Sequence, residues 1–238
     1  MVIFIMKCYI YCMKRLLPAV FAVLTLVSCA ARIEGSLAAD GSAAVNVSMS
    51  LEPRMTALIR SLSRAGGQES GAVLDGPVIA QSMSVAPGVV SASFRNTTDT
   101  AIEGQVRISH INDFLSAGIT FISFEQGRCV INLNLGNGPV IMSLLSQEIT
   151  GYLEALMAPL ATGERMTKSQ YLDDVAVFYN RSTSNEIAGS RVHVSIEFPG
   201  TITSVRGGTF SGRRAVFDIA LLDLLVLETP LTYEVTWR

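Results

Sequence analysis

Nucleophilic or metal chemistry in this 238-residue chain would have to come largely from its four cysteines and two histidines. His193 shares the polar side of an alternating strand with Arg191 and Glu197, which indicates a solvated side chain, and His110 ends a strand where it can cap the next element or face water. Cys129 lies in a strand-like run, which predicts a buried small hydrophobic side chain rather than a reactive thiol. The patterns H-E-x-x-H, C-x-x-C, G-x-S-x-G and the P-loop do not occur in the sequence. We therefore predict no catalytic residue, no metal site and no cofactor.

Two further patterns are weak as sources of chemistry. Asp173 and Asp174 are adjacent on a predicted helix, where consecutive side chains point about 100° apart, so metal binding by this pair alone is not expected. Asn137-Gly138-Pro139 follows a strand as a phosphate-binding turn would, but Ile141 stands where a third glycine is needed. We interpret this turn as the start of a helix.

Cys29 has the most distinctive setting of the four cysteines. Lys14 and Arg15 precede the apolar run 16–27, and the small residue Ser28 comes directly before Cys29. A basic segment, a short apolar segment and a small residue form a secretory signal, and the run is shorter than the roughly 20 residues of a membrane-spanning helix.

The four residues Leu26, Val27, Ser28 and Cys29 resemble the bacterial lipobox. This resemblance implies that the chain is cleaved before Cys29 and that the Cys29 thiol carries diacylglycerol. We therefore expect residues 1–28 to be a lipoprotein signal peptide recognised through Leu26, Val27 and Ser28, and residues 29–238 to be a single exported domain.

The start of the chain leaves alternatives open. Residues 1–12 are an unusual prefix to such a signal, and we interpret Met13 as the translation start; alternatively, residues 1–28 form one longer, uncleaved anchor. Cleavage would leave Cys129 as the only cysteine in the folded part, so no intramolecular disulfide is expected. It would also remove three basic residues and no acidic one, which changes the net charge from −2 to −5 and argues against a polybasic surface for anionic lipid or nucleic acid.

The exported part predicts alternating strands and amphipathic helices. An Asp40-Gly41 turn joins two strands within 31–51, and Val45, Val47 and Met49 share one side of the second. Further strands are predicted at 89–95, 101–111, 119–124, 129–135, 192–198, 201–206 and 231–237, with others between the glycines of 207–212, and short helices at 53–65, 77–83 and 220–227.

Two more helices complete the predicted fold. The longest opens at Asn137-Gly138-Pro139 and carries an apolar stripe as far as Met157, with Glu148 and Glu154 as its only charges. The other, at about 168–179, places Tyr171, Leu172, Val175 and Phe178 at helical spacing. The predicted fold class is therefore α+β: a largely antiparallel sheet with one long amphipathic helix and several shorter helices packed on it.

The composition is unusually poor in charge. Charged residues make up 16% of the chain, against about 25% in typical globular proteins. A groove between the long helix and the sheet that holds acyl chains, or a face that rests on the bilayer, would account for this. The alternative is that Ser, Thr, Asn and Gln supply the polar surface.

The combination of the lipobox at 26–29, the hairpin turn at Asp40-Gly41 and the C-terminal stretch 192–212 resembles the LppM-type family of bacterial lipoproteins. The stretch begins Val-His-Val-Ser-Ile-Glu-Phe-Pro-Gly and passes through Gly207-Gly208 to Gly212; members of the family likewise have a strand ending in Phe/Leu-Pro-Gly, a short strand, a glycine-containing turn and a further strand. The likeness covers 29–52 and 190–238, and 137–180 has no counterpart. It implies an α+β exported domain that handles lipid or envelope glycolipid and has no catalytic residue to carry over.

These observations predict a non-enzymatic envelope lipoprotein, anchored by Cys29 to the inner or outer membrane and facing the periplasm or the exterior. Membrane lipid is the expected partner through the acyl anchor, the folded domain is expected to bind lipid or glycolipid, and nucleic acid is not an expected partner. A second hypothesis is a scaffold or assembly lipoprotein that docks apolar helix faces on an envelope protein. A third, a hydrolase with acidic residues brought together only by the fold, has no local pattern in its support.

Overall fold

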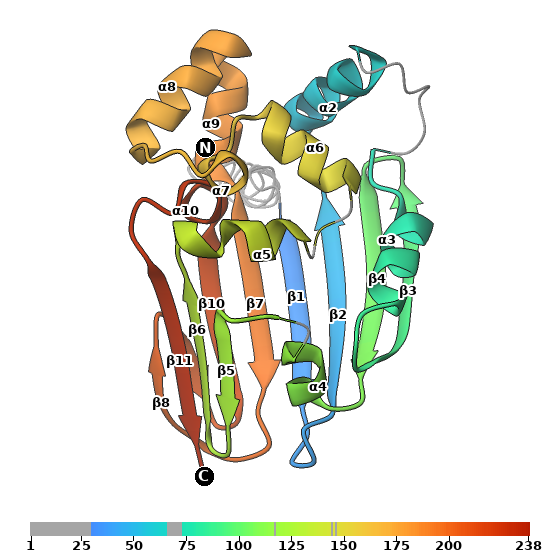
Figure 1. Ribbon diagram of the computed structural model, residues 1–238, viewed down its shortest axis with the longest axis vertical. Helices are drawn as coiled ribbons and strands as arrows, with labels where there is room; N and C mark the ends of the chain where they lie inside the picture. Colours follow the sequence, from blue (N-terminus) through green and yellow to red (C-terminus); the bar gives the residue numbers. More distant parts are fainter. Residues whose placement is uncertain (1–29, 66–72, 117, 144, 146) are drawn as a thin grey trace, which may run out of the picture.

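Two β-sheets and a group of helices make up the computed structural model, which describes residues 30–65, 73–116, 118–143, 145 and 147–238 (Figure 1). The larger sheet has seven strands in the order β3-β4-β2-β1-β7-β10-β9, and the smaller has four in the order β5-β6-β11-β8. Neighbouring strands are antiparallel except for β1 and β7, which are parallel. The predicted α+β class is confirmed, whereas the parallel pair and the division into two sheets were not predicted.

The strand bounds follow the predicted runs closely. The larger sheet contains β1 (Ala30–Leu37), β2 (Ala43–Ser50), β3 (Val89–Thr98), β4 (Ala101–Ile108), β7 (Arg191–Glu197), β9 (Thr209–Ser211) and β10 (Arg214–Ala220). The smaller contains β5 (Ile122–Glu125), β6 (Arg128–Leu133), β8 (Ile202–Arg206) and β11 (Leu231–Trp237).

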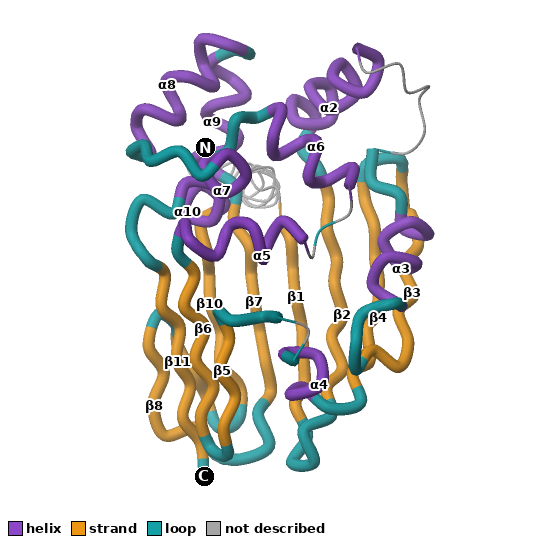
Figure 2. The backbone as a smooth tube through the Cα atoms, in the orientation of Figure 1, coloured by secondary structure: helices purple, strands orange, loops and turns teal. Residues whose placement is uncertain are grey.

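The helices lie mostly at one end of the strands, the end at which β1 begins (Figure 2). This helical end contains α2 (Pro53–Ala65), α6 (Gln147–Ala155), α7 (Pro159–Thr162), α8 (Lys168–Phe178), α9 (Arg181–Gly189) and α10 (Leu221–Val226). The others are α3 (Gly76–Ser84), which packs beside β3, α4 (Ile111–Leu115), the 3-10 turn η1 (Leu135–Asn137) and α5 (Gly138–Ser143).

The hairpin between β1 and β2 shows how the sequence sets the local structure. The Asp40 carboxylate accepts hydrogen bonds from the backbone N–H of Ser42 at 2.9 Å and from its hydroxyl at 2.7 Å. Gly41 has a φ of +83°, and a Cβ there would lie 2.8 Å from Nε2 of His110. The turn therefore needs glycine both for its left-handed backbone and for the imidazole packed on it.

Strand alternation gives the larger sheet an apolar inner face and a polar outer face. Ile33 of β1 is opposite Val47 of β2, and both belong to the inner face, while the adjacent pair of Glu34 and Asn46 belongs to the outer face. The inner face is the one turned toward the second sheet, because Phe217 packs with Val235 in a shared core.

Two separate clusters of buried side chains result. The sandwich core, between the two sheets, contains Leu37, Phe198, Ile202, Ala215, Phe217 and Val235. The helical core, at the helical end, contains Met55, Ile59, Val73, Leu156, Ala158, Tyr171, Val175, Ile187, Leu225 and Val226.

The predicted long helix is wrong in one respect: it is two helices, α5 ending at Ser143 and α6 beginning at Gln147. The Ser143 hydroxyl donates to the carbonyl of Val140 at 2.7 Å, a side-chain contact of the kind that competes with helical hydrogen bonding. The strand predicted to run to 111 also ends earlier, at Ile108, because His110 caps α4.

Candidate functional site

The predicted lipid-attachment residue Cys29, and Leu26, Val27 and Ser28 before it, lie outside the described residues. The described chain begins at Ala30, which is the first residue of β1. Ala30 is paired with Arg191, the first residue of β7, and β1 lies between β2 and β7 within the seven-stranded sheet. The described chain therefore enters the sheet at the residue that follows Cys29 in the sequence.

Next to this entry point stands the antiparallel pair of α8 and α9. Thr167 and Gln170 form a capping box that begins α8, and the Asn180 side chain caps α9 by accepting from the N–H of Thr183 at 2.8 Å. Tyr171 and Val175 of α8 are buried at 1% and 0% exposure and pack in the helical core. The Ser184 hydroxyl of α9 donates to the carbonyl of Leu172 at 2.8 Å and ties the two helices together.

Residues 177–181 form the tip of this helix pair, called here the α8–α9 tip. Val177 and Phe178 end α8 and are 80% and 64% exposed. Phe178 was expected on the packed side of the helix, but the last turn of α8 reaches the far end of the molecule (Figure 1). There the elements that bury Tyr171 and Val175 no longer cover it.

Glu186 links α9 to the start of α2. Its carboxylate accepts from the backbone N–H of Arg54 at 3.3 Å, so it serves as a cap supplied by a neighbouring helix. Burial raises the pKa of Glu186, the nearby Glu52 adds to the rise, and the backbone N–H groups of Arg54 and Met55 oppose it.

A half-covered apolar strip runs along the inner face of the two central strands. It consists of Ile33 of β1 and Val45, Val47 and Met49 of β2, all of them half-buried. On the same face of the sheet, Ala215 and Phe217 of β10 are buried at 0% and 6% exposure under the second sheet. The inner face is thus sealed on the β10 side and only partly covered over β1 and β2.

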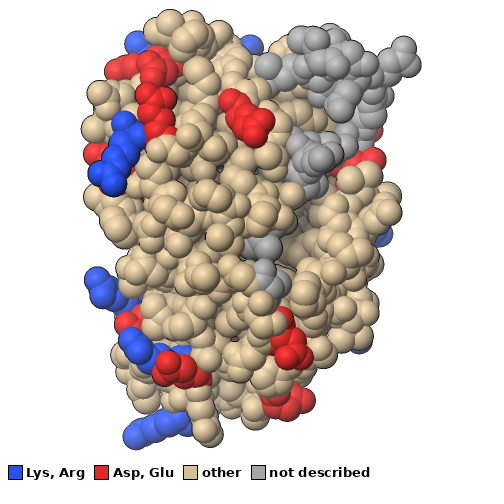
Figure 3. All heavy atoms as spheres, in the orientation of Figure 1, with Lys and Arg blue, Asp and Glu red and all other residues tan. Residues whose placement is uncertain are grey.

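The face of the molecule drawn in Figure 3 carries little charge. Figure 3 shows Lys, Arg, Asp and Glu side chains toward its two ends and an uncharged band across the middle. A half-covered apolar strip in a protein of low charge is a setting in which an acyl chain could lie. A groove between one long helix and the sheet was one of the alternatives considered for the low charge. Because that helix is divided, the strip on β1 and β2 is the candidate surface instead.

The residues considered for catalysis either cap or pair with neighbouring elements or are exposed on the surface. His110 accepts from the N–H of Asn112 at 3.2 Å through Nδ1 and caps α4. His193 is half-buried on the outer face of β7, opposite Asp218 of β10. Asp173 and Asp174 are exposed on α8.

Cys129 packs at the edge of the sandwich core, as predicted for a small hydrophobic side chain. Burial raises the pKa of its thiol to about 11, so little thiolate forms near neutral pH. The side chain is therefore a packing residue in a weakly reactive state.

Two clefts lie at the end of the strands opposite the helical end, beside α4. One, of about 580 Å³, is lined in part by Glu197 and Arg213, whose charged groups pair with each other at 3.8 Å. The other, of about 270 Å³, is lined in part by His110 and Trp237. Since His110 is engaged in capping and Glu197 is paired, neither cleft presents a converging set of reactive groups.

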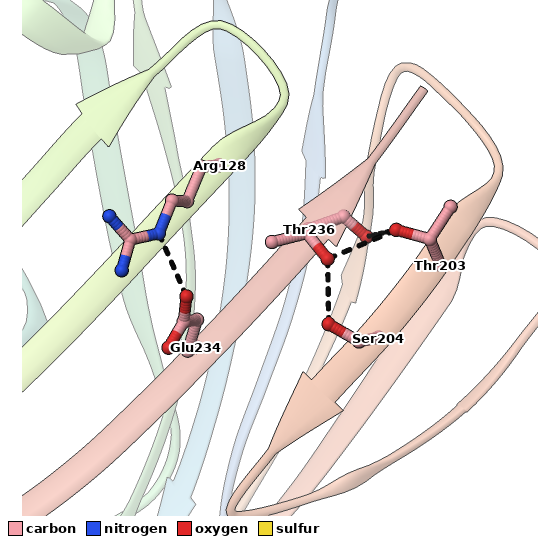
Figure 4. Close-up of polar contacts among 5 residues, drawn as sticks. All are labelled: Arg128, Thr203, Ser204, Glu234 and Thr236. Carbon is pink, nitrogen blue, oxygen red and sulfur yellow. Dashed lines mark hydrogen bonds and ion pairs between the residues drawn. The ribbon is translucent and has the colours of Figure 1, made fainter.

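The outer face of the second sheet satisfies its own polar groups. Arg128 Nε donates to Glu234 at 2.8 Å, and the Thr236 hydroxyl contacts the hydroxyls of Thr203 at 3.0 Å and Ser204 at 2.7 Å (Figure 4). The hydrogen bond to Glu234 raises the pKa of Arg128. These groups bind one another across strands and do not form a ligand site.

Within the described residues, no group of three or more His, Cys, Asp and Glu side chains is arranged to hold a metal ion. Over the same part of the chain, no helix has the length and apolar character needed to cross a membrane.

Comparison with solved structures gives a distant structural resemblance. The structure is similar to the folded domain of the LppM protein of Mycobacterium tuberculosis, determined by NMR, with 11% sequence identity and a TM-score of 0.39 over 89% of this chain and 90% of that one. No family model matches the sequence, and no curated protein matches it.

Sequence reasoning missed both the strip and the tip as surfaces. The alternation of 45–51 indicated one buried side on β2, but it could not show that the second sheet stops short of covering that side. Helical spacing placed Phe178 with the packed residues, and only the three-dimensional position of the last turn exposes it.

Proposed function

We propose that this chain is a lipid-anchored lipoprotein of the bacterial envelope, without enzymatic activity, whose domain binds lipid. The observation that carries the proposal is the Leu26-Val27-Ser28-Cys29 motif, which follows a basic pair and a short apolar run and directly precedes β1. The diacylglycerol group on the Cys29 thiol carries two acyl chains. Two chains would hold the protein stably on a membrane, since a single chain gives only marginal binding.

The anchor is tested by expressing the full chain in a bacterium supplied with radiolabelled palmitate. We expect label on the protein, loss of label and of membrane association in Cys29→Ser, and accumulation of the uncleaved precursor when the lipoprotein signal peptidase is inhibited. Wild-type protein that stays unlabelled and is recovered in the cytosol would disprove the anchor. An intact N-terminal peptide in mass spectra of the membrane fraction would support the uncleaved alternative.

The half-covered strip on β1 and β2 supports lipid binding by the domain. The side chains of the strip are apolar and half-buried, so an acyl chain lying along them would remove apolar area from water without burying a charge. Val47 and Ser48 offer a matched pair of positions, because both are half-buried on β2 and belong to opposite faces.

We expect the purified full-length lipoprotein to retain noncovalent phospholipid that can be extracted and identified by mass spectrometry. Val47→Asp should retain much less because it places a carboxylate in the strip, whereas Ser48→Asp, on the outer face, should retain the wild-type amount. Equal retention in both variants would show that the strip is not the binding surface.

A scaffold role is the second candidate, and the edge of the larger sheet favours it. β3 is a ten-residue strand at one end of the sheet order, and among the described strands β4 is its only partner. Such an edge can accept an extended segment of another protein by strand addition. A stoichiometric protein partner in place of phospholipid after detergent extraction would favour this role.

A further inference from the structure

Two adjacent large apolar side chains project from the α8–α9 tip. Val177 and Phe178 are 80% and 64% exposed, whereas Val175, two residues earlier on the same helix, is 0% exposed. The change from complete burial to exposure occurs within one turn of helix, at the extreme end of the molecule (Figure 1).

The tip is held in place by its neighbours. The Tyr179 hydroxyl donates to the carbonyl of Ala155, which ties the end of α8 to α6. Asn180 Oδ1 accepts from both the N–H and the hydroxyl of Thr183, at 2.8 and 3.2 Å, and fixes the turn into α9. Val177 and Phe178 are therefore presented to the surroundings by an ordered turn.

The position of the tip relative to the start of β1 suggests what covers it. α9 leads into β7, whose first residue Arg191 is paired with Ala30, and Ala30 directly follows Cys29 in the chain. From that pair α9 extends away from the sheets toward the tip (Figure 1), and its nine residues span about 13 Å. An acyl anchor on Cys29 would therefore hold this end of the domain, and not the clefts at the far end, against the bilayer.

We propose that the α8–α9 tip inserts Val177 and Phe178 into the bilayer that holds the acylated Cys29, an inference that rests on the proposed anchor. Contact with acyl chains would remove the apolar surface of Val177 and Phe178 from water, which favours binding. Arg181, exposed at the start of α9, can pair with lipid phosphate. Asp173 and Asp174 lie one turn back on α8, exposed, and their carboxylates must stay in water. Insertion is therefore shallow and orients the domain with its helical end toward the membrane.

The test uses the full-length lipoprotein in vesicles of phosphatidylethanolamine and phosphatidylglycerol that contain phosphatidylcholine brominated at known acyl positions. One variant is Phe178→Trp. The matched control is Val85→Trp, because Val85 is 82% exposed and ends α3 away from the tip. Trp237, near the C-terminus at the end opposite the helices, is present in both proteins and in wild type as an internal reference.

We expect bromine to quench the indole introduced by Phe178→Trp, more strongly from shallow acyl positions than from deep ones, and to leave the Val85→Trp and wild-type emission unchanged. Equal, negligible quenching at both positions in protein that floats with the vesicles would overturn the insertion while leaving the anchor intact. Quenching that is strongest from deep acyl positions would overturn the shallow orientation. Protein that does not float would overturn the anchor and the insertion together.

Discussion

The sandwich end of the molecule is packed with aromatic side chains in contact with one another, whereas the helical end buries polar atoms that lack hydrogen-bond partners in the described chain. In the sandwich, Trp237 stacks on Phe124 at a centroid distance of 5.9 Å and packs against Phe198 in a tilted arrangement at 4.9 Å. Phe217 meets Tyr233 edge-on at 5.4 Å. At the helical end, three buried side-chain atoms have no hydrogen-bond partner within the described structure: Thr56 Oγ1, Tyr171 Oη and Glu186 Oε2.

Backbone conformation shows the same contrast. Met157, after α6, and Leu227, after α10, adopt left-handed φ values of 52° and 47°, and both lie at the helical end. In the described residues they are the only non-glycine residues with positive φ, and each costs on the order of 1 kcal/mol. The turns at the opposite end of the strands, between β1 and β2 and between β5 and β6, place Gly41 and Gly127 in this region instead.

This difference indicates that, within the described residues, the helical end gives up some stability through unpartnered polar atoms and strained backbone, whereas the sandwich does not. Unsatisfied buried polar atoms and strained residues reduce local stability, and such features concentrate where a structure meets a partner. The helical end is also where β1 begins and where the α8–α9 tip is exposed. Substitutions at the two ends should therefore have unequal effects.

The largest effect is expected in the sandwich core. Phe217→Ala removes a side chain that is 6% exposed and leaves a cavity beside Tyr233, which should lower the free energy of unfolding by about 3–5 kcal/mol. Phe210→Ala is the control, since Phe210 on β9 is 46% exposed and should cost far less. Denaturant titration followed by circular dichroism measures both. A similar loss in the two variants would remove the distinction between core and surface in the sandwich.

The next effect concerns the alkylation rate of the Cys129 thiol. Because burial raises the pKa of Cys129 to about 11 from an ordinary value of 9.0, its thiolate fraction near neutral pH should be about a hundredfold lower than in the unfolded chain. Alkylation of the folded protein should be slower than alkylation in denaturant by at least this factor. A thiol placed at the tip by Val177→Cys should react at the unfolded rate. Fast alkylation of folded Cys129 would show that the sandwich core is open to solvent.

A smaller effect is expected from Glu186. Burial is the main cause that raises the pKa of Glu186 in the folded state, so folding favours the neutral carboxyl. The neutral carboxyl therefore contributes its full share to the free energy of unfolding only below the pKa that Glu186 has in the unfolded chain. As pH rises through the folded-state pKa, wild type should lose free energy of unfolding relative to Glu186→Gln, which has no carboxyl to ionise. Parallel pH profiles for the two proteins, or a relative gain for wild type with rising pH, would contradict this.

Much of the fold could be predicted from alternation and helical spacing. The β1–β2 hairpin follows from Asp40-Gly41 and the alternation of 45–51, and the helix at 168–178 follows from the spacing of Tyr171 and Val175. The parallel pairing of β1 with β7 could not be predicted, because it joins segments about 160 residues apart and depends on long-range geometry.

The two candidate surfaces, the strip on β1 and β2 and the α8–α9 tip, were harder to predict from the sequence. α9 is rich in Ser, Thr and Asn, so it has little apolar periodicity, and the helix pair that forms the tip was not recognised. The partial cover over β1 and β2 arises from where the second sheet ends, and this depends on strand order rather than on any local pattern.

The smallest effect concerns one hydroxyl group in the helical core. Tyr171 is 1% exposed, burial raises its pKa, and its Oη has no partner within the described structure, so Tyr171→Phe removes a desolvated polar atom without opening a cavity. The free energy of unfolding should stay the same or rise by up to about 1 kcal/mol. Tyr179→Phe is the matched control: its hydroxyl donates to the carbonyl of Ala155, and losing that bond should cost about 1 kcal/mol. The two substitutions delete the same atom from positions about two turns apart, Tyr171 within α8 and Tyr179 directly after it. Opposite signs in denaturant titrations would therefore show that the helical end tolerates an unsatisfied group. A clear loss in Tyr171→Phe would mean that the hydroxyl is satisfied in solution and that the two ends of the molecule are more alike than their contacts indicate.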